Sequence, residues 1–232
     1  MKKPAHAKEI FDEFEKQWGR EARPASDFRY DEPLDDLLLT ILSQNTNDKN
    51  RDKAYAKLRE TYPHWEQVAE APVESVIDCI RVAGLGETKA KHMKSVLEIV
   101  KEKFGSYSLK ALEDWKTEDI RSFLVSLPGI GVKTAGIVLV FDLGREAFPV
   151  DTHITRITKR LGWVPENWTP AKIQEYLEAV LDGSRFRGGH LNFLEHGRNV
   201  CGARKPKCTE CTAAQWCKFG KAELKKKAKT AK

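Results

Sequence analysis

The sequence predicts an all-α protein, and two observations carry that prediction. In most segments apolar residues recur at positions i, i+3, i+4 and i+7, the spacing that places them on one face of a helix. Strand-like alternation of apolar and polar residues is nearly absent. We therefore expect about ten short helices of about three turns each.

The expected helices follow one another along the chain. Residues 37–42 form the first apolar helix, and Thr169 followed by proline marks a capped helix start further on. Residues 137–143 have the composition of a strand, but they follow a glycine turn that opens a helix, so we expect a buried helix there. The clearest amphipathic stripes lie at residues 73–80, 93–104, 120–127, 154–161 and 173–181.

Length and composition exclude several classes of protein. The chain has 232 residues, of which 41% are apolar and 32% charged, the balance of a globular protein with a sizeable core. No run of about 18 apolar residues is present, so we expect no transmembrane helix. Acidic residues interrupt the N-terminal segment, so we expect no secretory signal. The net charge of +6 is weak evidence for a polyanionic partner.

Four of the five cysteines lie near the C-terminus, in the pattern Cys201-x6-Cys208-x2-Cys211-x5-Cys217. An odd, lopsided set without an export signal argues against a disulfide framework and for a reducing compartment. Four cysteines so close together indicate metal binding, and both zinc and a [4Fe-4S] cluster accept four thiolates. One short gap and two long gaps favour iron–sulfur without deciding between them. Cys79 lies in an apolar helical stripe and is expected to be buried.

The most informative stretch is the sequence LPGIGVKTA at residues 127–135. Pro128 ends one helix, Gly129 and Gly131 permit positive φ, and the next helix begins at about Val132. Uncovered amides at a helix N-terminus suit a phosphate, although an ordinary connection between two helices has the same pattern. The turn by itself implies contact with a DNA backbone without reading of sequence.

Lys133 falls in the first turn of the helix that follows. The positive end of the helix dipole disfavours an ammonium group there. This field, together with partial burial, would favour the uncharged amine, a nucleophile able to form a Schiff base. A phosphate-binding or solvated lysine is the alternative interpretation.

Asp151 stands at the start of another helix, in the sequence VDTH at residues 150–153. Its position is that of an N-cap, and capping alone would explain it. If one carboxylate oxygen caps the helix and the other faces a cleft, the group could also stabilise a positive charge on a sugar or shuttle protons. His153 is either a polar group near the substrate or an exposed helix residue.

A basic loop, with Arg204, Lys205 and Lys207, separates the first two clustered cysteines. These charges could offset the thiolates or meet phosphates.

Taken together, these features resemble the endonuclease III family of the helix–hairpin–helix DNA glycosylase superfamily. The hairpin with its lysine, the VDTH segment and the cysteine spacing carry the resemblance, in the family's order. It extends from about Leu34 to Cys217.

The resemblance implies an all-α architecture of two helical domains with a DNA-binding cleft between them. Residues 34–145 would form a helical barrel domain with the hairpin. Residues 1–33 and 146–220 would form a discontinuous iron–sulfur domain. Residues 221–232, with six lysines and one glutamate, are expected to be a disordered basic tail, either solvated or in weak contact with DNA.

The resemblance also assigns roles. Lys133 would be the nucleophile and Asp151 the catalytic carboxylate. The four clustered cysteines would ligate a [4Fe-4S] cluster that supports structure and DNA engagement. The partner would be damaged double-stranded DNA, with no membrane partner, and the protein a monomer in the cytoplasm, associated with the nucleoid.

Two loops correspond to family segments that enter the DNA duplex. The family has a glutamine that fills the gap left by the flipped base, and its position aligns with Asn45, one residue after Gln44. Either side chain could fill the gap. Leu85 matches the family's wedge into the opposite strand, and Gly86 replaces a larger side chain.

The expected activity is that of a bifunctional DNA glycosylase/AP lyase acting on oxidised pyrimidines such as thymine glycol. Lys133 favours this assignment, because related mismatch-specific glycosylases typically lack the lysine and only remove the base. A monofunctional glycosylase for mismatched or alkylated bases is one alternative. A weakly catalytic DNA-binding protein with a redox-responsive cluster is the other.

Overall fold

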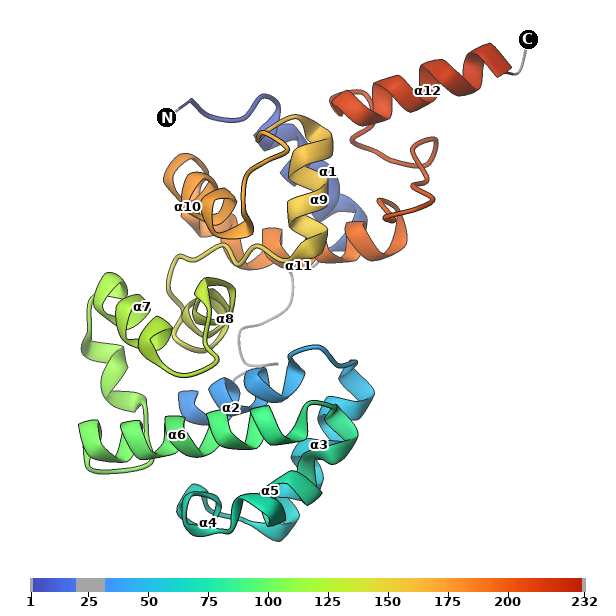
Figure 1. The fold of residues 1–232 in the computed structure, drawn as a ribbon. Coiled ribbons are helices and arrows are strands. Elements are labelled where there is room, and N and C mark those ends of the chain that lie inside the picture. Colours follow the sequence, from blue (N-terminus) through green and yellow to red (C-terminus); the bar gives the residue numbers. More distant parts are fainter. Residues whose placement is uncertain (1, 20–31, 231–232) are drawn as a thin grey trace. The chain divides into compact units, whose positions relative to one another are not determined.

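The computed structural model describes residues 2–19 and 32–230, and every regular element in these ranges is a helix (Figure 1). The all-α prediction is confirmed. The chain divides into two compact units, which we call the hairpin unit (Phe28–Arg145) and the cysteine unit (Met1–Asp27 with Glu146–Lys232). Of the range 1–33 assigned to the iron–sulfur domain from sequence, residues 1 and 20–31 lie outside the described residues. No described helix is long and apolar enough to cross a membrane.

The hairpin unit is built around α2 (Pro33–Ser43) and the long helix α6 (Gly86–Phe104). Leu37, Leu38 and Ile41 of α2 are fully buried, because α2 packs against α3, α6 and the segment after α8. The remaining helices of this unit are α3 (Asp48–Thr61), α4 (Trp65–Glu70), α5 (Val73–Ile80), α7 (Thr117–Ser126) and α8 (Val132–Ile137). Cys79 on α5 is buried, as predicted.

A short turn of π-helix, η5 (Val138–Asp142), continues α8. Val138, Leu139 and Val140 are buried in it. The prediction of a buried helix rather than a strand over residues 137–143 is therefore confirmed. The change from α to π geometry was not predicted. Such π turns inside helices are rare and occur often near functional sites.

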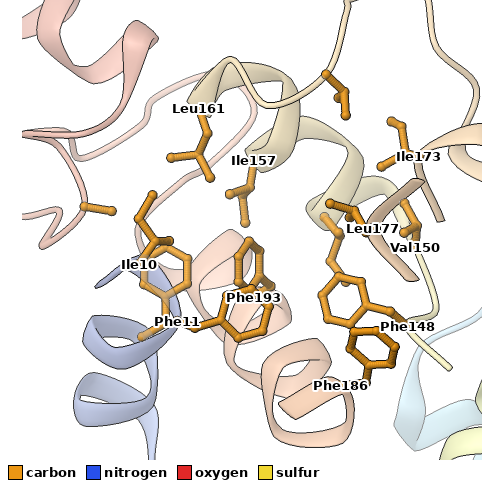
Figure 2. Packing of buried hydrophobic residues seen from close by; sticks show 14 of the residues in the cluster. Ile10, Phe11, Phe148, Val150, Ile157, Leu161, Ile173, Leu177, Phe186 and Phe193 are labelled. Carbon is orange, nitrogen blue, oxygen red and sulfur yellow. The ribbon is translucent and has the colours of Figure 1, made fainter. Parts of the chain in front are cut away.

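The cysteine unit joins the N-terminal helix to the C-terminal third of the chain. Figure 2 shows its core, in which aromatic rings from α1 (Ala7–Trp18) meet Phe193 of α11 (Phe186–Asn199) and the apolar face of α9 (Thr152–Leu161). The packing is mostly edge-on or tilted, as aromatic pairs prefer. The other helices of this unit are α10 (Pro170–Val180) and α12 (Lys218–Thr230).

The basic tail differs from its prediction. Residues 221–230, expected to be disordered, belong to α12. The residues of this segment are chiefly lysine, alanine, leucine and glutamate, which are strong helix formers. The first turn of the helix is also held, because the N–H of Lys221 donates to the carbonyl of Cys217. Within the helix, Glu223 pairs with Lys226 at 2.9 Å. Residues 231 and 232 lie outside the described residues.

We expect Phe193→Ala to lower the free energy of unfolding by about 3–5 kcal/mol, the usual cost of removing a buried ring. Phe193 is fully buried, and its ring centroid lies 4.9 Å from that of Phe14 and 5.1 Å from that of Phe11. Urea unfolding checks this, with Phe193→Leu as a control that retains most of the volume and should lose less. Equal stability of the alanine variant and the wild type would contradict the packing described.

Candidate functional site

The glycine turn between α7 and α8 has the predicted boundaries. The helix α7 ends at Ser126, before Pro128, and α8 begins at Val132. Gly129 adopts the left-handed conformation with φ +77°. Gly131 does not use the positive φ that glycine permits: its φ is −94°, an ordinary value for the residue that caps a helix. A Cβ atom at Gly131 would meet no heavy atom within 4 Å, so the space beside its backbone is open.

Gly129 is exposed but contacts two side chains from other segments. A Cβ atom there would lie 2.2 Å from Nδ1 of His92, on α6. Nε2 of Gln44, at the end of α2, donates to the carbonyl oxygen of Gly129 at 2.9 Å. The glycine is required by both its backbone angle and its neighbours. Sequence reasoning named Gln44 only as a candidate DNA contact and did not identify His92, because both contacts with Gly129 join distant segments.

Lys133 is the second residue of α8, directly after the turn. Its side chain is exposed, so the partial burial expected from sequence is not observed. An exposed lysine at a helix start is placed to reach a second molecule. The exposure is compatible both with a nucleophile and with the alternative of a phosphate-binding or solvated lysine.

Two loops of the hairpin unit come together beside this turn. Asn45, in the loop after α2, lines an open pocket together with Val82 and Gly84. Leu85, just before α6, is 57% exposed and has φ +50°. Val82 is also a large exposed apolar side chain, and sequence reasoning missed it, although its place just before the Gly84–Gly86 turn was visible.

A buried lysine connects these two loops. Nζ of Lys89, in the first part of α6, donates to the carbonyl oxygens of Leu42 at 2.8 Å and Ala83 at 2.9 Å. The residue is only 1% exposed, and burial lowers the pKa of its ammonium group. Leu42 lies two residues before Gln44 and Ala83 two residues before Leu85. Lys89 therefore fixes the backbone from which both loops start.

In the cysteine unit, Asp151 caps α9 as predicted. Its Oδ1 accepts a hydrogen bond of 2.8 Å from the N–H of Ile154. The side chain is half-buried. Because a cap of this kind needs one oxygen, the second oxygen of the carboxylate is available for another contact.

His153 faces α11 rather than open solvent. Its ring lies against Gly197, where a Cβ atom would be 2.7 Å from Nδ1. Its Nδ1 lies 3.0 Å from the Arg156 guanidinium, which places the acceptor nitrogen at this contact. The interpretation of His153 as an exposed helix residue is therefore wrong, since the ring is half-buried.

Two arginines one turn apart on α9 join the aspartate's helix to the cysteine loop. Arg156 donates to the carbonyls of Gly197 at 2.9 Å and Cys201 at 2.8 Å. Arg160 donates to the carbonyl of Gly202 at 2.8 Å and contacts Sγ of Cys201 at 3.2 Å. Sequence reasoning missed both residues. Their i, i+4 spacing on the helix of Asp151 was the available signal.

All four clustered cysteines line one cavity, together with Arg160 and Phe219. Cys208 and Cys217 are buried, and the other two are half-buried. Burial raises the pKa of the Cys211 thiol to about 11, and the neighbouring cysteines add to the shift. Within residues 2–19 and 32–230, however, no group of three or more His, Cys, Asp or Glu side chains that could hold a metal ion is found.

A buried histidine stands behind the cysteine cavity. His196 is 2% exposed, its ring stacks on Phe14 with centroids 4.0 Å apart, and its Nε2 lies 3.4 Å from Sγ of Cys211. Burial lowers its pKa to about 4, so the ring is neutral at pH 7. The loop between Cys201 and Cys208 carries the basic residues predicted to meet phosphates. All three are exposed: Arg204, Lys205 and Lys207.

Comparisons with known proteins show the family and the fold of the chain. Residues 38–182 match the family described as HhH-GPD superfamily base excision DNA repair protein. The chain is 36% identical over 185 residues to endonuclease III of Sulfolobus acidocaldarius, which covers 79% of this chain and 80% of that protein. It is 35% identical over 198 residues to endonuclease III of Thermotoga maritima, covering 84% and 88%. A solved structure of an endonuclease III trapped as a covalent intermediate with DNA matches with a TM-score of 0.81 at 25% identity, covering 97% of this chain and 100% of that chain.

The two glycines of the turn should respond differently to the same substitution. We expect Gly129→Ser to lower the free energy of unfolding by about 2 kcal/mol or more, through left-handed strain and collision with His92. Gly131→Ser should not lower it, because the backbone there is ordinary and serine is a good N-cap. Urea denaturation of both variants measures the difference, and equal losses would contradict the distinct environments.

Proposed function

The chain belongs to the HhH-GPD superfamily of base excision DNA repair proteins and is a DNA glycosylase/AP lyase, and from this premise we propose that Lys133 is its nucleophile. The resemblance to the endonuclease III family is confirmed by its relatives. We further propose that the substrates are oxidised pyrimidines of the thymine glycol type in duplex DNA. One observation carries the proposal: Lys133 is an exposed amine directly after the braced glycine turn.

The proposed reaction starts when the damaged nucleotide leaves the base stack, because its C1′ is otherwise out of reach. The amine of Lys133 attacks C1′, the C1′–N bond breaks, and the base leaves with a proton. The C1′–O4′ bond of the adduct then opens, O4′ takes up a proton, and the Schiff base formed at C1′ acidifies the C2′ proton. Removal of that proton expels the 3′ phosphate by β-elimination, which cuts the strand 3′ to the lesion.

Asp151 is proposed to be the catalytic carboxylate of the same reaction. Its capping bond to Ile154 occupies Oδ1 and fixes the orientation of the carboxylate. The remaining oxygen would stabilise positive charge on the sugar and relay the proton given up by the amine. The capping role and the catalytic role are compatible, because they use different oxygens.

The remaining predicted residues are proposed to hold the DNA. The amides at Gly129 and Gly131 would meet a phosphate, and the exposed Leu85 would insert between bases. His153 would contact the nucleotide through the nitrogen that does not face Arg156. Arg204, Lys205 and Lys207 would meet phosphates of the flanking duplex. Gln44 and Asn45 are treated separately below.

The cysteine cavity fits a [4Fe-4S] cluster by the chemistry of its donors. Cys201, Cys208, Cys211 and Cys217 supply four thiols to one cavity, and Arg160 beside Cys201 would offset thiolate charge. We propose that these residues hold the cluster. It would cross-link the loop between α11 and α12, as metal binding commonly stabilises small loops, and would take no part in base removal.

Borohydride trapping on DNA that contains thymine glycol tests the nucleophile. We expect the wild type to form a covalent protein–DNA adduct and Lys133→Ala to form none, because the amine is the group that is trapped. Lys133→Ala should fold normally, since the side chain is exposed. Asp151→Asn is the matched control for the carboxylate: asparagine still caps α9, so DNA binding should remain while turnover falls at least about 100-fold.

Efficient base release by the wild type without any adduct would overturn this mechanism. It would assign the protein to the monofunctional glycosylases instead. Binding without release of any base would support the weakly catalytic alternative.

Metal analysis tests the cofactor. We expect purified protein to be yellow-brown and to contain about four irons per chain, as a [4Fe-4S] cluster requires. Cys211→Ala should lose iron, whereas Cys79→Ala should retain it, because Cys79 is buried in α5, outside the cavity. One equivalent of zinc in place of iron would refute the cluster.

A further inference from the structure

Gln44 uses its side-chain amide inside the protein. Its Nε2 donates to the carbonyl oxygen of Gly129 at 2.9 Å, across 85 residues of sequence. This hydrogen bond ties the loop after α2 to the turn that precedes Lys133. A side chain with its donor engaged in this way would have to break this bond before it could enter DNA.

The carbonyl that Gln44 holds belongs to a residue with little freedom. Gly129 has φ +77°, and His92 blocks the space beside its Cα on the α6 side. The turn is therefore held by a ring on one side and by an amide donor on another. Since Gly129 lies four residues before Lys133, the position of the turn determines where α8 begins and where the amine is presented.

The backbone of Gln44 is fixed independently of its side chain. Lys89 holds the carbonyl of Leu42, two residues earlier, and the N–H of Gln44 donates to the carbonyl of Ile41. A change confined to the Gln44 side chain should therefore leave its own loop in place. Such a change should mainly affect the position of Gly129, whose carbonyl oxygen would lose its donor.

Asn45 is different in each of these respects. Its side chain is exposed, its φ is +52°, and it faces an open pocket with Val82 and Gly84. Among the described residues, no hydrogen bond engages its side-chain amide. It is the member of the pair that is free to contact another molecule.

From this geometry we propose that Gln44 is a positioning residue for the catalytic hairpin and acts on the reaction through Gly129 and Lys133. The inference rests on the proposed function of Lys133. A displacement of about 1 Å at a reacting group can cost about 100-fold in rate, so a single bond to the turn is enough to matter. Sequence alone left Gln44 and Asn45 as equal candidates for the gap in the duplex.

Abasic DNA in single-stranded and duplex form separates the two roles. Filling a gap matters only in a duplex, whereas the position of Lys133 matters in both substrates. We expect Gln44→Met, which keeps the length and loses the donor, to slow borohydride trapping about tenfold on both substrates at saturating protein, the effect of one lost hydrogen bond. The ratio of the duplex rate to the single-strand rate should stay that of the wild type.

Asn45→Gly is the matched comparison, because glycine removes the amide and keeps the left-handed backbone. This variant should lower the duplex rate more than the single-strand rate and so change the ratio. Thermal unfolding checks that the variants fold. If Gln44→Met is unstable, Gln44→Glu, which keeps the shape and loses the donor, takes its place.

Slower trapping by Gln44→Met on the duplex alone would overturn the inference and make Gln44 the residue that fills the gap. Unchanged trapping on both substrates would overturn it as well. If the wild type traps neither substrate, the proposed role of Lys133 fails, and this inference fails with it.

Discussion

Short helices leave many backbone carbonyls without partners, and this protein satisfies them with long cationic side chains. Every α-helix ends with about four such carbonyls. Lys89 takes those at the ends of α2 and η3 (Arg81–Ala83), and Lys94 takes three at the end of α4. Arg156 and Arg160 do the same for α11 and the loop that follows. Most connections that place the candidate site depend on this one interaction.

This interaction between cations and carbonyls also changes what the net positive charge of the protein implies about its partners. Cations that bind carbonyls inside a unit are structural, and they do not measure affinity for a polyanion. Many other basic residues are exposed, and Lys133 and the basic loop from Arg204 to Lys207 are the ones for which we propose a role. Electrostatic attraction to DNA would therefore come from where these charges are placed rather than from the total of +6.

Local features were the ones that could be predicted from sequence. The helices, the turn before α8 and the cap at Asp151 depend on residues within one or two turns of each other. The basic tail was expected to be disordered because a lysine-rich end resembles a solvated tail, whereas residues 221–230 belong to α12. The contacts of Gln44, His92 and Lys89 could not be predicted, because their partners are 85, 37 and 47 residues away in the sequence. The periodicity of apolar residues along the sequence does not indicate contacts between segments that are so far apart.

The cap at Asp151 has a consequence for the entropy of catalysis. A free aspartate side chain samples several rotamers, and an enzyme that uses it must select one when the substrate arrives. Here the bond to Ile154 makes that selection while α9 folds. The loss of rotamer freedom is thus part of the folding free energy and is absent from the activation free energy of the proposed reaction. A carboxylate that closes a helix is for this reason already oriented before DNA binds.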